Sequence, residues 1–272
     1  MATTILVTGG TGTLGRQVVE RLVAAGHAVR VASRRATVPD PAHDAARPAA
    51  VENVAADLDT GRGVDSALAG IRTVVHCAGA QKGDGDKARM LVRAARDAGV
   101  IHLVFISVVG ADRVPVTGRF DHMAFEYFAS KRDAEGVVEG CGIPWTTLRA
   151  TQFHDLALLT LKAMAKLPVV PVPSGTRFQP VDSGEVADRL VEIALGSPAG
   201  YVPDLGGPTA YAFGDLLRSY LAAAGLRRLI VPVRLPGDAA RAIRAGANLA
   251  LDHADGRRTW EEFLAGHLPV RA

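Results

Sequence analysis

A glycine-rich segment near the N-terminus constrains the fold of this chain more than any other feature. Residues 8–15 read TGGTGTLG, which fits both the Gly-x-Gly-x-x-Gly and the Gly-x-x-Gly-x-x-Gly spacing. The short apolar run Ile5–Val7 precedes the segment and predicts a buried strand, and apolar residues at helical spacing follow it at 18–23. A strand, a tight glycine turn and a helix in this order predict the first strand–helix unit of a parallel α/β sheet.

Glycines at this spacing also have a chemical meaning. They allow a tight turn, they let the backbone approach a pyrophosphate, and they let the helix pack close to the sheet. The helix N-terminus then offers free N–H groups and a partial positive charge to phosphates. The strand before the loop and the helix after it favour a dinucleotide site over a glycine turn without a ligand. The residues expected to hold the nucleotide here are Gly9, Thr11, Gly12, Thr13, Leu14 and Gly15.

Strand and helix patterns alternate about six times over the first 150 residues. This alternation predicts right-handed crossovers, a doubly wound parallel sheet of the Rossmann type, and a nucleotide-binding core over residues 1–150. The expected strands are 5–7, 29–33, 54–56, 72–76, 102–107 and 144–148, and the expected helices are 18–23, 64–69, 87–98 and 120–139.

Residues 151–272 are less regular and predict a small mixed α/β substrate-binding cap. We expect it to pack on the carboxyl end of the sheet, with some elements returning to the core in a single compact unit. Trp260, Phe263 and Leu264 are expected to dock a C-terminal helix. The other expected elements are helices at 153–166, 183–195, 213–224 and 239–250 and a strand at 229–231.

Composition narrows the class of protein. The formal net charge is only +3 over 272 residues and the basic residues are dispersed, so no nucleic-acid partner is expected. The two cysteines, Cys77 and Cys141, form no Cys-x-x-Cys spacing, so neither a metal site nor a disulfide framework is expected, and a reducing compartment fits. No signal-peptide pattern and no apolar run of about 20 residues occurs, so we expect a cytoplasmic protein without a membrane partner, either monomer or homodimer.

The end of the second predicted strand bears on the choice between NAD and NADP. An NAD-preferring site usually carries an acidic residue there, whereas this chain has Ser33, Arg34 and Arg35. Two guanidinium groups suit a 2′-phosphate, which favours NADP(H), although both arginines could also be solvated loop residues. Asp57 and Leu58 follow the third predicted strand, where they could meet the adenine, and Asp57 could equally cap a helix.

Besides the glycine-rich segment, the sequence contains the motifs Phe105–Gly110, Tyr127–Lys131, Pro144–Arg149, Thr151–His154, Val181–Asp182 and Val186–Ala187. These motifs resemble the extended and atypical short-chain dehydrogenase/reductase superfamily, and its NmrA-like, NAD(P)H-binding branch in particular. The resemblance covers nearly the whole chain and implies an active site of Ser107, Tyr127 and Lys131, with Lys131 also holding the nicotinamide ribose.

The spacing of Tyr127 and Lys131 supports these roles. Residues four apart share one helix face, and a nearby ammonium lowers the pKa of a phenol from its ordinary value of about 10. Tyr127 could then give a proton to a carbonyl oxygen, while Ser107 hydrogen-bonds the same oxygen. The pattern could also be accidental, because members of this branch include NADP-binding regulators without known chemistry, and Ser107 could be structural.

Other candidates lie at predicted strand ends. Cys77, Ala78 and Gly79 follow the fourth strand and are expected beside the cofactor. His122, Phe153 and His154 are expected to contact the substrate, and His154 is the alternative proton donor to Tyr127. Together these features predict an NADPH-dependent reductase of a carbonyl or quinone-like, fairly apolar substrate. A catalytically silent NADP(H) sensor and a non-redox isomerase or dehydratase with bound nucleotide stay open.

Overall fold

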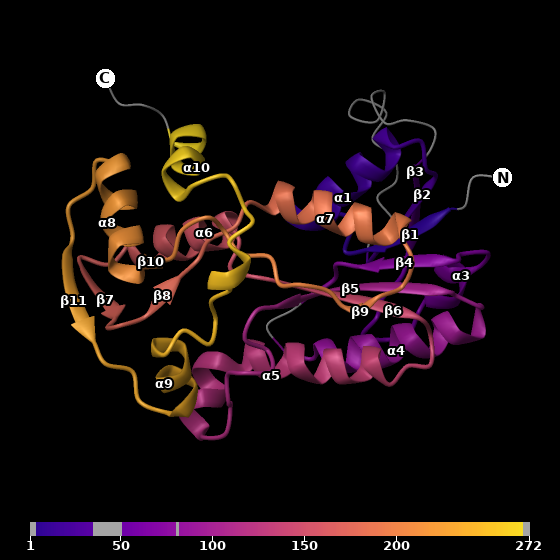
Figure 1. The fold of residues 1–272 in the computed structure, drawn as a ribbon, viewed down its shortest axis with the longest axis horizontal. Coiled ribbons are helices and arrows are strands. Elements are labelled where there is room, and N and C mark those ends of the chain that lie inside the picture. The colour runs from indigo at the N-terminus through magenta and orange to yellow at the C-terminus, as the bar shows by residue number, and fades with distance from the viewer. Residues whose placement is uncertain (1–3, 35–50, 80–81, 269–272) are drawn as a thin grey trace. The chain divides into compact units, whose positions relative to one another are not determined.

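The computed structural model describes residues 4–34, 51–79 and 82–268 (Figure 1). The chain forms two compact units, and each unit draws on several stretches of the sequence. The first contains residues 1–107, 130–148 and 186–202, and the second contains residues 108–129, 149–185 and 203–272. The units therefore interleave along the chain, and the functional boundary expected at residue 150 stays a prediction.

A seven-stranded parallel sheet organises the first unit. Its order is β3-β2-β1-β4-β5-β6-β9, so the chain steps outward from β1 to β3, returns to the middle at β4 and steps outward again. This is the predicted doubly wound, Rossmann-type arrangement, which is confirmed. The strands are β1 (Ile5–Thr8), β2 (Val29–Ser33), β3 (Val51–Ala55), β4 (Thr73–His76), β5 (His102–Val108), β6 (Trp145–Ala150) and β9 (Gly200–Tyr201).

Helices flank the sheet on both faces. Figure 1 shows α1 (Thr13–Ala24) and α7 (Ser183–Leu195) on one side, and α4 (Asp84–Asp97) and the C-terminal part of α5 (Arg119–Glu139) on the other. A short helix, α3 (Val64–Leu68), contributes to the same apolar core as α4. All seven residues of β5 are buried, as expected for a parallel strand covered on both faces.

Two glycines end helices that flank the sheet. Gly26 and Gly99 follow α1 and α4 with φ angles of +85° and +74°, a region that favours glycine. The backbone N–H of Gly26 donates to the carbonyl of Val23, and that of Gly99 donates to the carbonyl of Arg96. These bonds satisfy carbonyls that a helix end leaves open, which fixes where each helix stops.

The second unit has its own apolar core. Trp260 and Phe263 of α10 are buried there with leucines of α6 and α8, so the predicted docking of the C-terminal helix is confirmed. The helix expected at 239–250 is shorter than predicted: it ends at Arg244, and Gly246 follows with a φ of +94°. The elements are α6 (His154–Met164), β7 (Val169–Pro173), β8 (Arg177–Phe178), β10 (Tyr211–Ala212), α8 (Phe213–Ala223), β11 (Leu229–Val233), α9 (Asp238–Arg244), the 3-10 helix η1 (Leu251–His253) and α10 (Trp260–His267).

A membrane-spanning helix needs about 20 predominantly apolar residues. Within residues 4–34, 51–79 and 82–268, no helix combines that length with the required hydropathy.

Candidate functional site

Two glycines of the loop between β1 and α1 leave no room for a side chain. Gly9 has a φ of +68°, and a Cβ atom there would lie 2.7 Å from the Cα of Ala78. A Cβ on Gly15 would collide with the carbonyl oxygen of Gly9. The backbone N–H of Gly12 donates to that same carbonyl over 2.9 Å and closes the turn. The loop is therefore held tightly, against the end of β4 on one side and against α1 on the other.

The start of α1 is suited to a phosphate group. Gly12 occupies the N-cap position, and no side chain of the described residues accepts a hydrogen bond there. The first turn contains no acidic residue, and Thr11, Gly12 and Thr13 are exposed, whereas Leu14 is buried. Free N–H groups and the helix dipole then offer positive potential to an anion. The backbone cradle and this helix start fit the pyrophosphate of a dinucleotide.

A buried hydrogen bond joins β1 to β4 beneath this loop. The hydroxyl of Thr8 lies 2.6 Å from Nδ1 of His76, whose ring stacks on Phe105 at 5.5 Å between centroids. Burial, helped by the positive charges of Lys131 and Lys87, lowers the pKa of His76 to about 3. The imidazole is therefore neutral at physiological pH. It serves to fix the strand end that Cys77, Ala78 and Gly79 continue.

Lys131 of α5 lies buried near the ends of β4 and β5. Its ammonium is 3.0 Å from the carboxylate of Asp84, and it donates to the carbonyl of Ile106 over 3.3 Å. It also lies 5.1 Å from the centre of the Phe105 ring. A Cβ on Gly79 would approach the same nitrogen to 3.2 Å. The structure thus brings Lys131 beside Gly79, two residues that the sequence predicts at the cofactor.

Asp84 is a site residue that the sequence analysis missed. It is the first residue of α4, and its backbone N–H donates to the hydroxyl of Ser130, the neighbour of Lys131. Acidic residues are common in the first turn of a helix, so the sequence offers a capping role for Asp84 and no sign of its partner. Only the packing of α4 beside α5 joins the two groups.

Ser107 and Tyr127 take the places in the secondary structure that the resemblance implies. Ser107 lies near the carboxyl end of β5 and is buried, and its hydroxyl has no hydrogen-bond partner within the described residues. Tyr127 precedes Lys131 by one turn of α5, is half-buried, and its ring meets Phe128 edge-on at 6.1 Å. The catalytic roles of both residues stay predictions.

The residues expected to distinguish NADP from NAD lie at the end of β2 and just after it. Ser33 is half-buried, and its carbonyl accepts from the backbone N–H of Ala56 over 2.9 Å. Arg34 is exposed at the end of the strand, so its guanidinium is accessible. Arg35, the second arginine of the prediction, lies outside the described residues.

Asp57 forms a turn with its own neighbours. Its carboxylate accepts from the backbone N–H of Asp59 and from the hydroxyl of Thr60, each over 3.0 Å. These two bonds, together with the charge of Arg34, hold the pKa of Asp57 below its ordinary value. Leu58 packs partly buried against the core of the first unit. The carboxylate is therefore ionised at neutral pH in an exposed turn, where it is available to a polar ligand.

His154 is fully enclosed in the second unit. Its ring stacks on Phe263 with 4.8 Å between centroids and lies 6.0 Å from Trp260. Burial lowers the pKa of His154 to about 4. A neutral imidazole in an aromatic core cannot supply an acidic proton at neutral pH, so the environment of His154 does not favour it as a proton donor.

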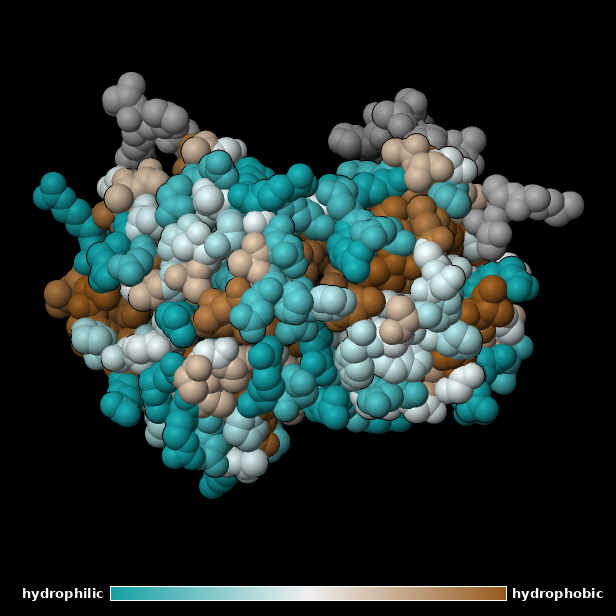
Figure 2. All heavy atoms as spheres, in the orientation of Figure 1, coloured by the Kyte–Doolittle hydropathy of each residue, from teal (hydrophilic) through white to brown (hydrophobic). Residues whose placement is uncertain are grey.

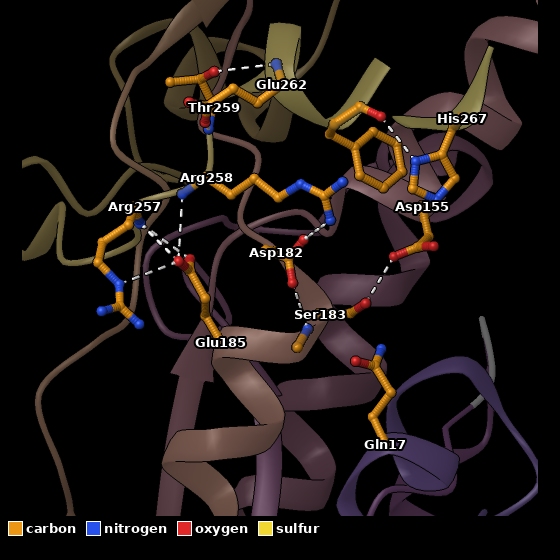
Figure 3. A network of polar contacts seen from close by, with 12 residues as sticks. Gln17, Asp155, Asp182, Ser183, Glu185, Arg257, Arg258, Thr259, Glu262 and His267 are labelled. Atoms are coloured by element: carbon orange, nitrogen blue, oxygen red, sulfur yellow. Dashed lines mark hydrogen bonds and ion pairs between the residues drawn. The ribbon is translucent and has the colours of Figure 1, made fainter. Parts of the chain in front are cut away.

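A network of polar contacts joins the segment before α10 to the start of α7 (Figure 3). Arg258, just before α10, donates to Asp182 over 2.8 Å, and Glu185 accepts from the backbone N–H groups of residues 257 and 258. The hydroxyl of Ser183 donates to Asp155 on α6. The bonds of residues 257 and 258 hold the segment before α10 at the start of α7, and the bond of Ser183 joins that start to α6. Trp260 and Phe263 of α10 lie against the histidine ring.

The other two predicted substrate residues differ in exposure. His122 is exposed, and its Nδ1 lies 2.8 Å from the carboxylate of Glu126. Phe153 is half-buried at the N-cap position of α6. Substrate contact by either residue stays a prediction. Among the residues that the structure describes, no group of three or more His, Cys, Asp or Glu side chains could hold a metal ion.

Comparison with known proteins places this geometry among nucleotide-binding folds. The sequence profile of a family described as NAD(P)H-binding matches residues 9–194. The crystal structure of an NADPH-dependent quinone oxidoreductase from Escherichia coli, complexed with NADPH, is similar with a TM-score of 0.76. The match covers 97% of this chain and 99% of that one at 19% identity, so it shows a shared fold.

Curated relatives are similar at the sequence level. An uncharacterized protein of Mycobacterium tuberculosis (strain H37Rv) is 29% identical over 92% of this chain and 26% of its own length. The ceramide reductase of Caulobacter vibrioides is 32% identical over 69% of this chain and 59% of its own length. The chain thus spans about a quarter of the first relative and about three fifths of the second.

Proposed function

The chain belongs to the NAD(P)H-binding family, within the short-chain dehydrogenase/reductase superfamily that its motifs resemble, and on that premise we propose that it is an NADPH-dependent reductase of a carbonyl or quinone-like, fairly apolar substrate. The observation that carries the proposal is the buried ammonium of Lys131. It lies beside Gly79 at the end of β4, and Tyr127 precedes it by one turn of the same helix. Binding of a nucleotide alone would not require a tyrosine at that spacing.

Three residues of this chain would take part in the reduction of the carbonyl group. When bound, NADPH supplies the hydride that reduces the carbonyl carbon. Tyr127 gives its phenolic proton to the carbonyl oxygen, and the positive charge of Lys131 stabilises the phenolate that is left. The hydroxyl of Ser107 donates a hydrogen bond to the same oxygen as negative charge develops on it. The product is the alcohol, and a proton from solvent restores Tyr127.

Tyr127 is a better proton donor than His154 on physical grounds. A general acid must carry a proton at the working pH and must reach the substrate. His154 is fully buried and burial lowers its pKa to about 4, whereas Tyr127 is half-buried and offers a phenolic hydroxyl.

NADPH is the proposed cofactor because of the charge at the end of β2. The exposed guanidinium of Arg34 suits the 2′-phosphate, with Arg35 next to it in the sequence. An acidic residue in this place, which would favour the ribose hydroxyls of NAD, is absent from the sequence Ser33-Arg34-Arg35. We propose a cytoplasmic reductase whose substrate is a small molecule, and the names of the ceramide reductase and the quinone oxidoreductase agree with an apolar carbonyl compound.

The test is NADPH oxidation by the purified protein against a panel of ketones and quinones, with Tyr127→Phe and Tyr201→Phe as matched variants. Tyr201 lies on the edge strand β9, which β6 separates from β5, and its ring meets Trp145 edge-on at 5.0 Å between centroids. We expect turnover by the wild type and by Tyr201→Phe, and a loss of at least about a hundredfold in kcat for Tyr127→Phe.

Each other result points to a different function. Turnover that survives Tyr127→Phe keeps the reductase and removes Tyr127 as the proton donor. Tight NADPH binding without turnover of any substrate favours a silent sensor. Co-purified nucleotide without net consumption of cofactor favours an isomerase or dehydratase.

A further inference from the structure

Strands β7 and β11 of the second unit form a parallel sheet of two strands only. Leu229 pairs with Val169, Val231 pairs with Pro171, and Val233 pairs with Pro173 in register. Side chains alternate between the two faces of a strand, so residues 229, 231 and 233 of β11 share one face. All six positions in these three pairs are apolar.

The face that carries these pairs is exposed. Leu229 is 64% exposed, Val169 46%, and Val231 and Val233 38% each, whereas Val170 on the opposite face is fully buried. Figure 2 shows hydrophobic side chains gathered at the left edge of the molecule, where Figure 1 draws β11 and β7. Parallel strands are ordinarily covered on both faces, so an uncovered apolar face of this kind indicates a surface that binds something.

The two segments that contain these strands carry only positive charge. Neither residues 156–181 nor residues 216–237, which contain both strands, include any Asp or Glu. Lys166, Arg227 and Arg228 line an open hollow of about 650 Å³ beside Leu229, at the start of β11. Arg234 follows the other end of β11 and is exposed. Cations therefore lie at both ends of the apolar face, and its partner should be apolar with an anionic border.

A second copy of the chain does not match this chemistry. Strand addition at the edges is disfavoured, because Pro171, Pro173 and Pro232 lack the backbone N–H that a new strand would need. Face-to-face pairing about a two-fold axis would place equivalent cations of the two copies in one interface that holds no carboxylate from these segments.

We propose that this basic–apolar face, defined by Lys166, Val169, Arg227, Leu229, Val231 and Val233, docks on a membrane surface that carries anionic lipid headgroups. The apolar side chains enter the boundary between headgroups and acyl chains, and the cations meet the phosphates around them. The sequence predicts no membrane partner because it lacks a spanning segment, but surface docking needs none. The proposal does not depend on the proposed reductase activity, and it would bring the protein to apolar substrates.

Vesicle binding tests the proposal without cofactor or substrate. The purified protein is sedimented with vesicles of phosphatidylcholine alone, or of phosphatidylcholine mixed with phosphatidylglycerol, at low and at high salt. The variants are Leu229→Glu with Val231→Glu, and Arg227→Glu, which alters only an exposed side chain. Leu251→Glu is the matched control, since Leu251 is an exposed leucine of the same unit that lies outside the face. Circular dichroism and NADPH binding verify that each variant is folded.

We expect the wild type and Leu251→Glu to bind only the anionic vesicles, and more weakly at high salt. The double variant and Arg227→Glu should each lose at least about tenfold in vesicle affinity. Equal binding to both vesicle types, no binding to either, or unchanged binding by the folded variants would overturn the proposal. So would a dimer, seen by light scattering, that Leu229→Glu with Val231→Glu dissociates, because a second copy would then cover the face. The Arg227→Glu result keeps the test decisive if the double variant does not fold.

Discussion

The carboxylate of Asp84 lies 3.0 Å from the ammonium of Lys131, and their side chains are only 1% and 5% exposed. Two buried opposite charges compensate each other, whereas removal of one leaves the other without its partner in a medium of low polarity. The pair therefore fixes a positive charge near the ends of β4 and β5, and each member depends on the other.

This dependence predicts strong non-additivity in a double-mutant cycle. Asp84→Asn and Lys131→Met should each lower the free energy of unfolding by about 3–5 kcal/mol, because each strands a buried charge. The double variant should lose clearly less than the sum of the two. Denaturant unfolding measures all four proteins. Asp86→Asn is the control: Asp86 is an exposed acid of the same helix and should change stability by less than about 0.5 kcal/mol. Strictly additive losses would mean that the two charges do not interact.

Two glycine-to-alanine changes should have opposite effects, one in the loop between β1 and α1 and one on α5. Gly15→Ala should abolish nucleotide binding and destabilise the protein, since the new Cβ would collide with the carbonyl of Gly9. Gly136→Ala, on the exposed side of α5, meets no atom within 4 Å and should stabilise by about 0.5–1 kcal/mol through helix propensity. Titration of NADPH by fluorescence and thermal unfolding measure the two effects. Normal nucleotide binding by Gly15→Ala would remove the loop from the cofactor site.

Two buried histidines predict a loss of stability in mild acid. The folded-state pKa of His76 is lowered to about 3 and that of His154 to about 4, against about 6.5 in the unfolded chain. Above pH 6.5 both states are neutral at these positions, and as the pH falls below 6.5 only the unfolded state takes up the protons. The free energy of unfolding should therefore fall by roughly 1.4 kcal/mol per pH unit for each histidine.

Between pH 6.5 and pH 5 most carboxylates stay ionised, so a change in the free energy of unfolding over this window reports mainly on the histidines. Denaturant unfolding at several pH values in that window gives the slope. His154→Phe should reduce the slope, because this variant lacks one of the two imidazoles. A stability that is flat over this window in the wild type would show that neither imidazole resists protonation.

The charge at the end of β2 predicts the cofactor preference. Arg34→Glu should weaken NADPH binding by at least about tenfold and leave NADH binding nearly unchanged, because only NADPH carries the 2′-phosphate. Arg96→Glu, an equally exposed charge reversal on α4, controls for the change in net charge. Equal losses for both cofactors, or none for NADPH, would argue against recognition of the phosphate by Arg34.

The sequence by itself determined the nucleotide-binding core. Apolar runs alternate with residues at helical spacing, and Gly26 and Gly99 mark two helix ends, so local periodicity and turn chemistry suffice to predict the doubly wound sheet. The glycine loop follows from spacing alone, because a close backbone approach allows no side chain at Gly9 or Gly15. The helix predicted at 239–250 is too long. Its residues suit a helix up to Arg244, and Gly246 then takes a φ of +94°, which ends it.

Only the tertiary structure decided which side chains meet. In the sequence, Asp84 is an ordinary helix-start residue. Only the packing of α4 beside α5 pairs its carboxylate with the ammonium of Lys131. His154 follows a strand end like other candidate site residues, and α10, far along the chain, encloses it. The valines of β7 and β11 would suit any core, and their exposure depends on what packs against each face of that sheet. Local sequence sets the period of an element, but the partner of a side chain depends on residues distant in the chain, which no local pattern encodes.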